Sequence, residues 1–196
     1  MANEQIDPMV LRLVDRKGDV ALVLRNASPP TKIRVSSRAL ISASPFFRAM
    51  LNGHYAEGKQ LIETGRAEIE LEDEDDPEAM VMVLKAIHSR HTPRFEQIPR
   101  TLMRVIIILD KFMIPREKFE RQLLACVETL QPPTDSDEMT CLVCIVWMLG
   151  YPSVFAMLAR AIVVAGVKLD FTGLPVPGQV AGMISQTWHQ NMNLIC

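Results

Sequence analysis

The stretch VSSRALISASPFFRAML, from Val35 to Leu51, decides how the chain is built, because its apolar residues have helical spacing while Ser44-Pro45 sits in its middle. A proline inside a helix removes a backbone donor and clashes with the preceding turn, at a cost of about 3 kcal/mol. Two helices avoid that cost if Ser44 caps the second one and Pro45 takes its first position. The stretch therefore predicts a helical hairpin that ends near Gly53.

Composition limits the class of protein. The chain has 196 residues, of which 48% are apolar, enough for one substantial core or for a domain with a helical extension. Residues 68–78 hold eight acids and no base, which leaves 23 − 8 = 15 acids against 21 bases elsewhere. Those bases form no cluster, so a nucleic-acid partner is not predicted.

The cysteines and apolar runs bear on the compartment. Four cysteines and no signal peptide at the start, MANEQIDPMV, predict an intracellular protein, cytoplasmic or nuclear, without disulfides. The longest apolar runs, such as CLVCIVWML, are shorter than the roughly 18 to 20 residues that a bilayer requires. No membrane association is predicted.

The segments around the hairpin predict strands. GDVALVL (18–24) and TKIRVS (31–36) predict an antiparallel pair joined by a loop, because their inward and outward residues alternate. AEIEL (67–71) predicts a third strand, and the polar stretch before it, 54–65, predicts a loop. With the helices on either side, these strands predict an α+β core.

The rest of the chain predicts helices. A helix is predicted to begin at Pro77, with Asp76 as its N-cap. Its buried side is predicted to consist of Met80, Leu84 and Ile87. The buried residues predicted for the next two helices are Leu102, Val105, Ile106, Leu109 and Met113, then Phe119, Leu123, Val127 and Leu130. After QPPTDSDE (131–138), helices are predicted over 139–149 and 152–166. A last helix with Val180, Ile184 and Trp188 is weakened by two glycines.

The order of these elements, and four motifs within them, resembles the BTB/POZ family over about residues 17–130. GDVALVL resembles that family's first strand, and KIRVSSRALISASPFFRAML its second strand and hairpin. IELEDEDDPEAMVMVLKAIH resembles the third strand and next helix, and LDKFMIP a later helix. The characteristic family positions are occupied here by Asp19, Leu40, Ser44, Phe47, Asp110 and Lys111.

The resemblance implies a small mixed sheet packed with a helical layer and followed by an all-α extension. The parts are then an N-terminal segment (1–16), a BTB/POZ domain (17–131) and a helical extension (132–196). Leu40 and Phe47 are expected to pack inward together. The chain most resembles fungal proteins with one BTB domain and a helical tail. Its segment before Asp19 is short compared with members that exchange a helix and strand between protomers.

The same resemblance implies a non-enzymatic interaction module that needs no cofactor and binds protein partners or a second copy. Members that bind a cullin scaffold carry an apolar residue, any residue and a glutamate after the hairpin, and Tyr55-Ala56-Glu57 matches that pattern. The chain is then a substrate adaptor of a cullin-type ubiquitin ligase. A chance match on a polar loop is one alternative, and a self-associating or transcription-related assembly protein is another.

Cys141 and Cys144 form a CxxC, which raises the alternative of a thiol or metal enzyme. A zinc site needs about four ligands and no second close pair exists, while a redox motif needs a strand before its helix. Core packing is therefore predicted for both cysteines. His88 and His91 have no acidic or cysteine partner in helical register, so a helix end and a loop are predicted there. No metal site is predicted.

Overall fold

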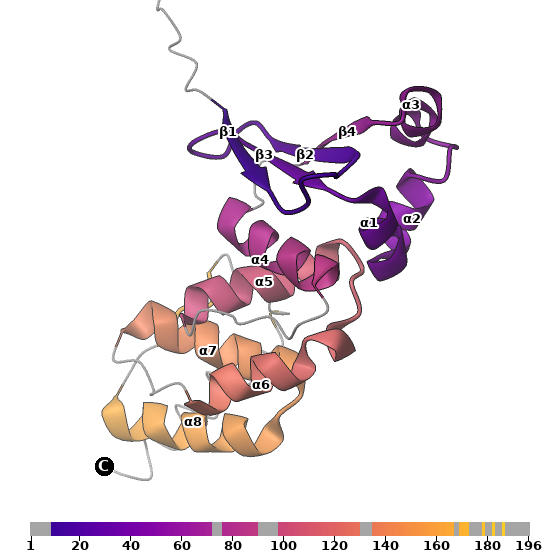
Figure 1. Ribbon diagram of the computed structural model, residues 1–196. Helices are drawn as coiled ribbons and strands as arrows, with labels where there is room; N and C mark the ends of the chain where they lie inside the picture. The colour runs from indigo at the N-terminus through magenta and orange to yellow at the C-terminus, as the bar shows by residue number, and fades with distance from the viewer. Residues whose placement is uncertain are drawn as a thin grey trace, which may run out of the picture. The chain divides into compact units, whose positions relative to one another are not determined.

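The computed structural model describes residues 9–71, 76–89, 98–129, 135–166 and 169–172, together with positions 178, 182 and 186. The chain divides into two compact units (Figure 1). The first consists of Met1–Arg94 and Ile108–Phe119, and the second of Phe95–Ile107 and Glu120–Cys196. Helix α5 (Pro99–Lys111) contributes residues to both units.

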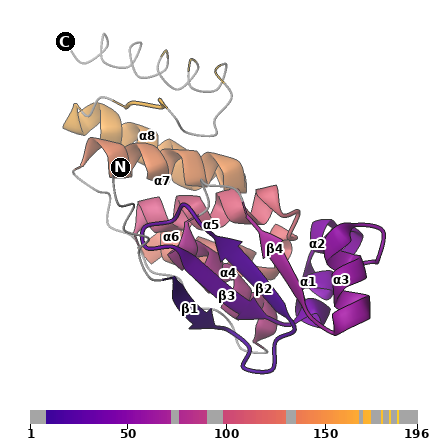
Figure 2. The same ribbon diagram turned by 90° about the horizontal axis from the view of Figure 1, so that it is seen from above.

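The first unit contains a four-stranded sheet in the order β1-β3-β2-β4 (Figure 2). Its strands are β1 (Val10–Leu13), β2 (Val20–Leu24), β3 (Thr31–Val35) and β4 (Ala67–Glu70). Strands β2 and β3 are antiparallel, which confirms the predicted pair, and β4 runs parallel to β2. Strand β1, parallel to β3, was not predicted, because a run of four residues carries no clear alternation and its partner is a distant segment.

The two faces of the sheet differ in character. The inner face is apolar and at most 2% exposed at Val20, Leu22, Leu24, Ile33, Val35 and Ile69. The outer face carries charged pairs: Lys32 bonds to Glu68 at 2.5 Å, and Arg25 bonds to Glu70. The inner face is therefore the side on which the core is built.

The predicted helical hairpin is confirmed as α1 (Ser37–Ala43) and α2 (Pro45–Met50). The Ser44 hydroxyl accepts a hydrogen bond from the Phe47 amide at 3.1 Å and donates one to the Phe112 carbonyl at 2.5 Å. The rings of Phe47 and Phe112 stack with centroids 5.1 Å apart, and Leu40 and Phe47 are fully buried. The bend therefore holds the hairpin against the end of α5.

The polar stretch predicted as a loop is helix α3 (Ala56–Thr64), so that prediction was wrong. The helix has no apolar stripe that periodicity could reveal, because it packs through Gly58. A Cβ on Gly58 would lie 2.4 Å from the Gly53 nitrogen, so the two backbones are in direct contact. Gly53 itself has a φ of 90°, which favours glycine.

Helix α4 (Pro77–His88) packs against β3 and α1. Asp76 accepts a hydrogen bond from the Ala79 amide at 2.8 Å, as the predicted cap requires. Met80 and Leu84 are buried as predicted, and Ile87 is half-buried. Helices therefore form a layer on the inner face of the sheet.

The remaining elements are η1 (Arg116–Lys118), α6 (Glu120–Thr129), α7 (Ser136–Leu149) and α8 (Pro152–Ala165). The predicted apolar residues of α5, η1 and α6 are buried except for two: Leu130 lies outside the described residues, and Met113 is 58% exposed. Met113 lies beyond the end of α5 with a φ of 51°, so it does not continue the helical face. Phe112 is buried instead of Met113.

Helix α7 begins three residues before the predicted Met139, because Asp135 caps it by accepting from the Glu138 amide at 2.9 Å. Gly150 ends α7 with a φ of 72°, and α8 ends at Ala165, as predicted. Val180, Ile184 and Trp188 lie outside the described residues. The predicted fold class, a mixed sheet with a helical layer followed by helices, is confirmed. No helix in the described ranges has the length and apolar character needed to span a membrane.

Candidate functional site

Tyr55, Ala56 and Glu57 form the start of helix α3, not a loop. Tyr55 is the capping residue in an extended conformation, and its side chain is 58% exposed. Glu57 lies in the first turn, where a negative charge is favourable against the helix dipole, and is half-buried. Helix α3 therefore presents a large ring and a carboxylate within one turn.

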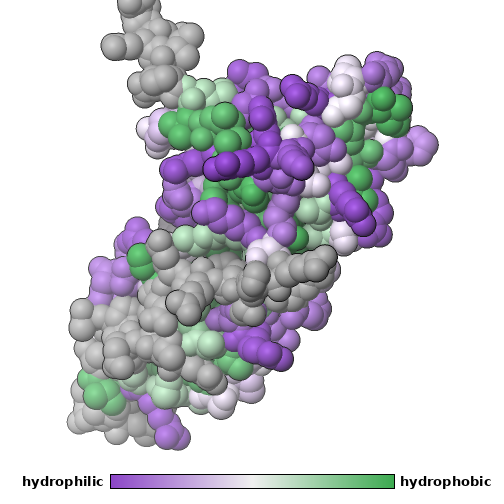
Figure 3. All heavy atoms as spheres, in the orientation of Figure 1, coloured by the Kyte–Doolittle hydropathy of each residue, from purple (hydrophilic) through white to green (hydrophobic). Residues whose placement is uncertain are grey.

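The same helix carries an apolar residue that the sequence did not single out. Ile62 is 72% exposed and lies two turns beyond Tyr55. Figure 3 shows hydrophobic atoms gathered over α3. The adjacent pair Leu61-Ile62 gives no periodic signal, so only its exposure identifies Ile62.

Helix α3 is held by contacts at two of its residues, Gly58 and Gln60. Gly58 rests on the Gly53 backbone near the N-terminal end. In the middle of the helix, the Gln60 side chain accepts a hydrogen bond from the Glu68 amide at 3.2 Å, which ties α3 to β4. The helix that carries the predicted motif is thus positioned by one backbone contact and one side-chain hydrogen bond.

Asp19, Asp110 and Lys111, three of the predicted family positions, make side-chain contacts in the first unit. Asp19, next to β2, accepts hydrogen bonds from the Ser37 amide and hydroxyl, both at 2.7 Å. Asp110 accepts from Arg116 at 2.9 Å. The Lys111 ammonium lies 5.6 Å from the centroid of the Phe112 ring, close enough for a cation–π contact. Asp19 therefore joins the start of β2 to α1, Asp110 joins α5 to η1, and Lys111 contacts only the neighbouring ring.

A cavity of about 330 Å³ lies beside α1 and the end of α4. Its lining residues are Asp15, Ser36, Arg38, Ala39, Ser42, Ala43, Ile87 and His88. The His88 Nδ1 lies 2.7 Å from the Leu84 carbonyl, and its Nε2 accepts from the Ser36 amide at 2.9 Å. Both ring nitrogens thus contact backbone groups of the same unit, and His88 is the last residue of α4, which confirms the predicted helix end. His91 lies outside the described residues.

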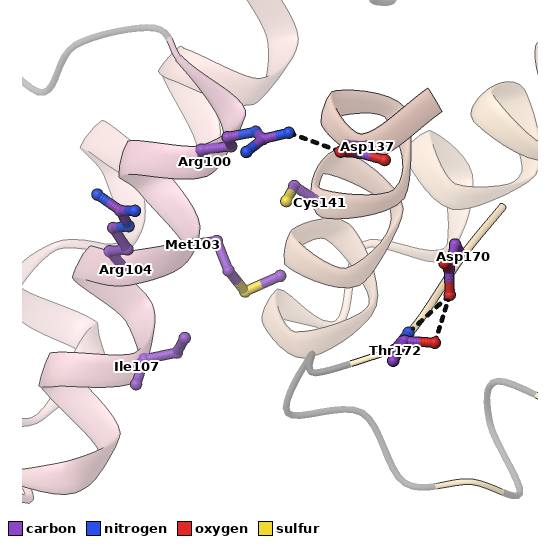
Figure 4. A pocket seen from close by; sticks show the side chains of 8 residues that line it. All are labelled: Arg100, Met103, Arg104, Ile107, Asp137, Cys141, Asp170 and Thr172. Carbon is purple, nitrogen blue, oxygen red and sulfur yellow. Dashed lines mark hydrogen bonds and ion pairs between the residues drawn. The ribbon is translucent and has the colours of Figure 1, made fainter. Parts of the chain in front are cut away.

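A second cavity, of about 360 Å³, lies in the helical unit (Figure 4). Its lining residues are Arg100, Met103, Arg104, Ile107, Asp137, Cys141, Asp170 and Thr172. Arg100 donates to Asp137 at 2.7 Å, and Asp170 accepts from the Thr172 amide and hydroxyl at 2.9 and 2.6 Å. These polar side chains therefore form hydrogen bonds with other residues of the cavity wall.

The two cysteines of the CxxC are core residues, as predicted. Cys141 is 7% exposed and Cys144 is fully buried. Burial raises the pKa of Cys144 to about 12, and burial, only partly opposed by Arg100, also raises the pKa of Cys141. Since the thiolate is the nucleophile and the metal ligand, both groups are unreactive thiols near neutral pH. Among the described residues no cluster of three or more His, Cys, Asp or Glu is placed to hold a metal.

Comparison with known protein families matches residues 11–124 to the BTB/POZ domain. Because this match covers more than half of the chain, the protein belongs to the BTB/POZ family. The family consists of non-catalytic modules for protein–protein interaction and oligomerisation, and the sheet with its helical layer is the BTB/POZ fold. No curated protein matches the chain. The predicted boundaries at 16/17 and 131/132 stay predictions.

Proposed function

We propose that this protein is a substrate adaptor of a cullin-type ubiquitin ligase, in which the start of α3 binds the scaffold. The observation that carries the proposal is an exposed Tyr55 and a half-buried Glu57 on the first turn of α3 in a BTB/POZ domain. The helical extension, residues 132–196, then recruits the substrate. This arrangement is that of fungal proteins with one BTB domain and a helical tail, acting in the cytoplasm or nucleus.

The chemistry of the two side chains supports a docking role. A tyrosine supplies a large contact area with few rotamers to immobilise, and its hydroxyl bonds at the edge of an interface. A glutamate accepts charge-assisted hydrogen bonds from a lysine or arginine of the scaffold. Both are carried by a helix fixed at Gly58 and Gln60, so little ordering is required on binding.

The test is Glu57→Lys, titrated by calorimetry against a cullin N-terminal domain. Reversing the charge should weaken binding by roughly 2 to 5 kcal/mol if the pair is buried. Stability should fall by about 1 kcal/mol at most, because a lysine in the first turn opposes the helix dipole. Circular dichroism checks the fold.

Glu63→Lys is the matched control, since Glu63 is exposed on the same helix and the charge change is identical. It should leave binding within about threefold of wild type. Absence of binding by the wild-type protein would refute the adaptor role. Equal losses for the two variants would assign the effect to net charge and not to Glu57.

A second candidate is a self-associating scaffold, such as a transcription-related assembly protein, that does not bind a cullin. The apolar residues exposed along β1 favour it.

An alternative from a different functional class is a thiol or metal enzyme that uses Cys141 and Cys144. Bound zinc by elemental analysis, or a thiol that titrates below its ordinary pKa, would support that rival.

A further inference from the structure

Helix α8 is apolar on more than the side that packs against α7. Its Leu158 and Ile162 are each 2% exposed. A second row of apolar residues runs along the same helix, which we call the outer stripe: Val154, Met157, Ala161 and Val164. In this row Met157 is 58% and Val164 is 83% exposed, and the other two residues are half-buried. The outer stripe is therefore an apolar surface turned to solvent.

The outer stripe has the pattern of a helix surface that another helix covers. Its residues follow one another at intervals of three and four, which keeps their side chains in line along the helix. The sequence of α8, PSVFAMLARAIVVA, contains one charged residue, Arg160, and a helix that is apolar around most of its circumference is normally buried. In Figure 1, α8 is the outermost labelled helix of its unit. The stripe thus needs a cover that the described helices do not supply.

The chain that follows α8 contains a segment suited to this role. Residues 173–196 include no Asp, Glu, Lys or Arg. Positions 178, 182 and 186 are helical, and they are exposed, half-buried and exposed in turn. A Cβ on Gly178 or Gly182 would meet no heavy atom within 4 Å. Because these positions recur every four residues, they define one side of a helix, and that side faces open space.

The apolar residues of the segment fall on the opposite side of such a helix. Val180, Ile184 and Trp188 each follow one of the three exposed positions by two residues, which is a rotation of about 200°. They lie outside the described ranges, so their side follows from the helical period. From first to last they span about 12 Å, and Met157 to Val164 spans about 10 Å. The two apolar rows therefore match in length.

We propose that residues 178–188 form a helix that packs antiparallel onto the outer stripe of α8. Its apolar residues then lie in order beside those of the stripe: Val180 beside Val164, Ile184 beside Ala161 and Trp188 beside Met157. The last pair places a thioether against an aromatic ring, which is a favourable contact. The outer stripe is thus a docking surface for an amphipathic helix, and this chain supplies that helix.

The course of the chain sets the direction of packing. Helices α7 and α8 are joined by the two residues 150–151, so they run antiparallel and the start of α7 lies beside the end of α8. The Asp170 amide donates to the Thr140 hydroxyl at 3.3 Å, which brings the chain back to the start of α7. Six residues from Thr172 to Gly178 span at most about 20 Å, so the segment begins near Val164.

The same short connection favours this segment over a second copy or another protein. A segment held by a short flexible link is present at an effective concentration in the millimolar range. A separate chain at micromolar concentration would have to bind the stripe about a thousandfold more tightly to displace it.

The first test follows the fluorescence of Trp188 in the full chain, in a Trp147→Phe background that leaves Trp188 as the one tryptophan. Its emission should lie at shorter wavelength than in the unfolded protein, because docking removes the ring from water. Met157→Lys should shift the emission to longer wavelength. Ala156→Lys is the matched control, since Ala156 is exposed on the same helix about 100° from Met157, and it should leave the emission unchanged.

The second test reads the register by disulfide crosslinking in a Cys196→Ser background. Each disulfide forms as two thiols lose two protons and two electrons to an added oxidant. Val180→Cys should crosslink with Val164→Cys within one chain, at the same yield at every protein concentration. It should not crosslink with Met157→Cys, which lies seven residues away on α8. Gly182→Cys, on the open side of the segment, should not crosslink with Val164→Cys.

Three results would overturn the proposal. The first is Trp188 emission that matches the unfolded protein, and the second is emission that Met157→Lys leaves unchanged. The third is a crosslink that joins two chains and grows with concentration, which would assign the outer stripe to a second copy.

Discussion

At the scale of single residues, Ser44 connects two parts of the fold that are far apart in the chain. Its hydroxyl accepts the Phe47 amide and donates to the Phe112 carbonyl, and the residue is fully buried. The first bond is local and follows from the Ser-Pro pair. The second joins residues 68 positions apart and makes Ser44 more than a helix cap.

Replacing Ser44 by alanine should therefore cost more than a cap alone. The lost cap contributes about 1 kcal/mol, and leaving the buried Phe112 carbonyl unpaired adds roughly 1 to 3. We expect Ser44→Ala to lower the free energy of unfolding by roughly 2 to 4 kcal/mol, and Phe47→Ala by about 3 to 5. Denaturant unfolding measures both.

Ser42→Ala, an exposed position in α1, is the matched control and should stay within about 0.5 kcal/mol of wild type. If Ser44→Ala changed stability no more than Ser42→Ala, the bond to Phe112 would not contribute to the fold.

The Cys144 thiol gives a prediction about pH. Its pKa is raised to about 12 in the folded protein, so the folded state holds this proton more tightly than the unfolded state. The stability it contributes is complete below the ordinary thiol pKa and is lost as pH rises from there towards the folded pKa. Within that window the loss is roughly 1 kcal/mol for each pH unit.

Cys144→Ala should therefore be less stable than wild type by about 1 kcal/mol near neutral pH, through lost packing. Near pH 10 the two proteins should be about equally stable, since only wild type loses the thiol contribution. Urea unfolding at both pH values measures the difference. A constant difference would show that the thiol is not protected by burial.

At the scale of elements, helix α3 illustrates packing by backbone. The helix packs closely against the Gly53 backbone through Gly58, and the Gln60 side chain accepts a hydrogen bond from the Glu68 amide of β4. The helix thus presents Tyr55 and Ile62 to solvent while contributing little apolar surface to the core. An element of this kind is suited to carry a docking surface.

Gly58→Ala should lower stability by about 1 kcal/mol or more, although alanine is the better helix former by nearly that amount. The added Cβ would meet the Gly53 backbone, which cannot yield as a side chain could. Thermal unfolding measures this change. Gln60→Ala cannot serve as the control, because the Gln60 side chain is hydrogen-bonded to the Glu68 amide of β4. Lys59→Ala, at an exposed neighbouring position, is the control and should change little. A stabilised Gly58→Ala protein would contradict the backbone contact.

At the scale of the whole molecule, the division into units does not follow the chain in order. Helix α5 contributes to both units, and residues 95–107 group with the helices after residue 120. Within the helical unit, α7 packs against α6 and α8 and buries every residue from Met139 to Val146. Residues before position 131 are therefore expected to need the extension in order to fold stably.

A chain truncated after Gln131 should accordingly fail to melt cooperatively and should bind a hydrophobic dye. The reason is that removal of α7 and α8 uncovers apolar residues of the helical unit that are buried in the intact chain. Circular dichroism melts and dye fluorescence of the two lengths give the answer. A truncated protein that melts at the wild-type midpoint would make the extension an independent addition.

The elements that the sequence determined are those with strong local signals. The hairpin bend at Ser44-Pro45, the cap at Asp76 and the end of α7 at Leu149 depend on neighbouring residues, so they were predictable. The alternation in β2, β3 and β4 and the helical spacing in α5 also identified most of the core. The family match over residues 11–124 agrees with the resemblance that these signals supported.

Only the tertiary structure decided the features that rest on distant contacts. Strand β1 is a strand because its backbone bonds to β3, and α3 is a helix seated on Gly53 without an apolar stripe. The exposure of Ile62 and of Leu11 cannot be read from residue type, since an apolar side chain is buried or exposed according to what packs over it. Local chemistry therefore specified the elements, and long-range packing determined which surfaces they leave for partners.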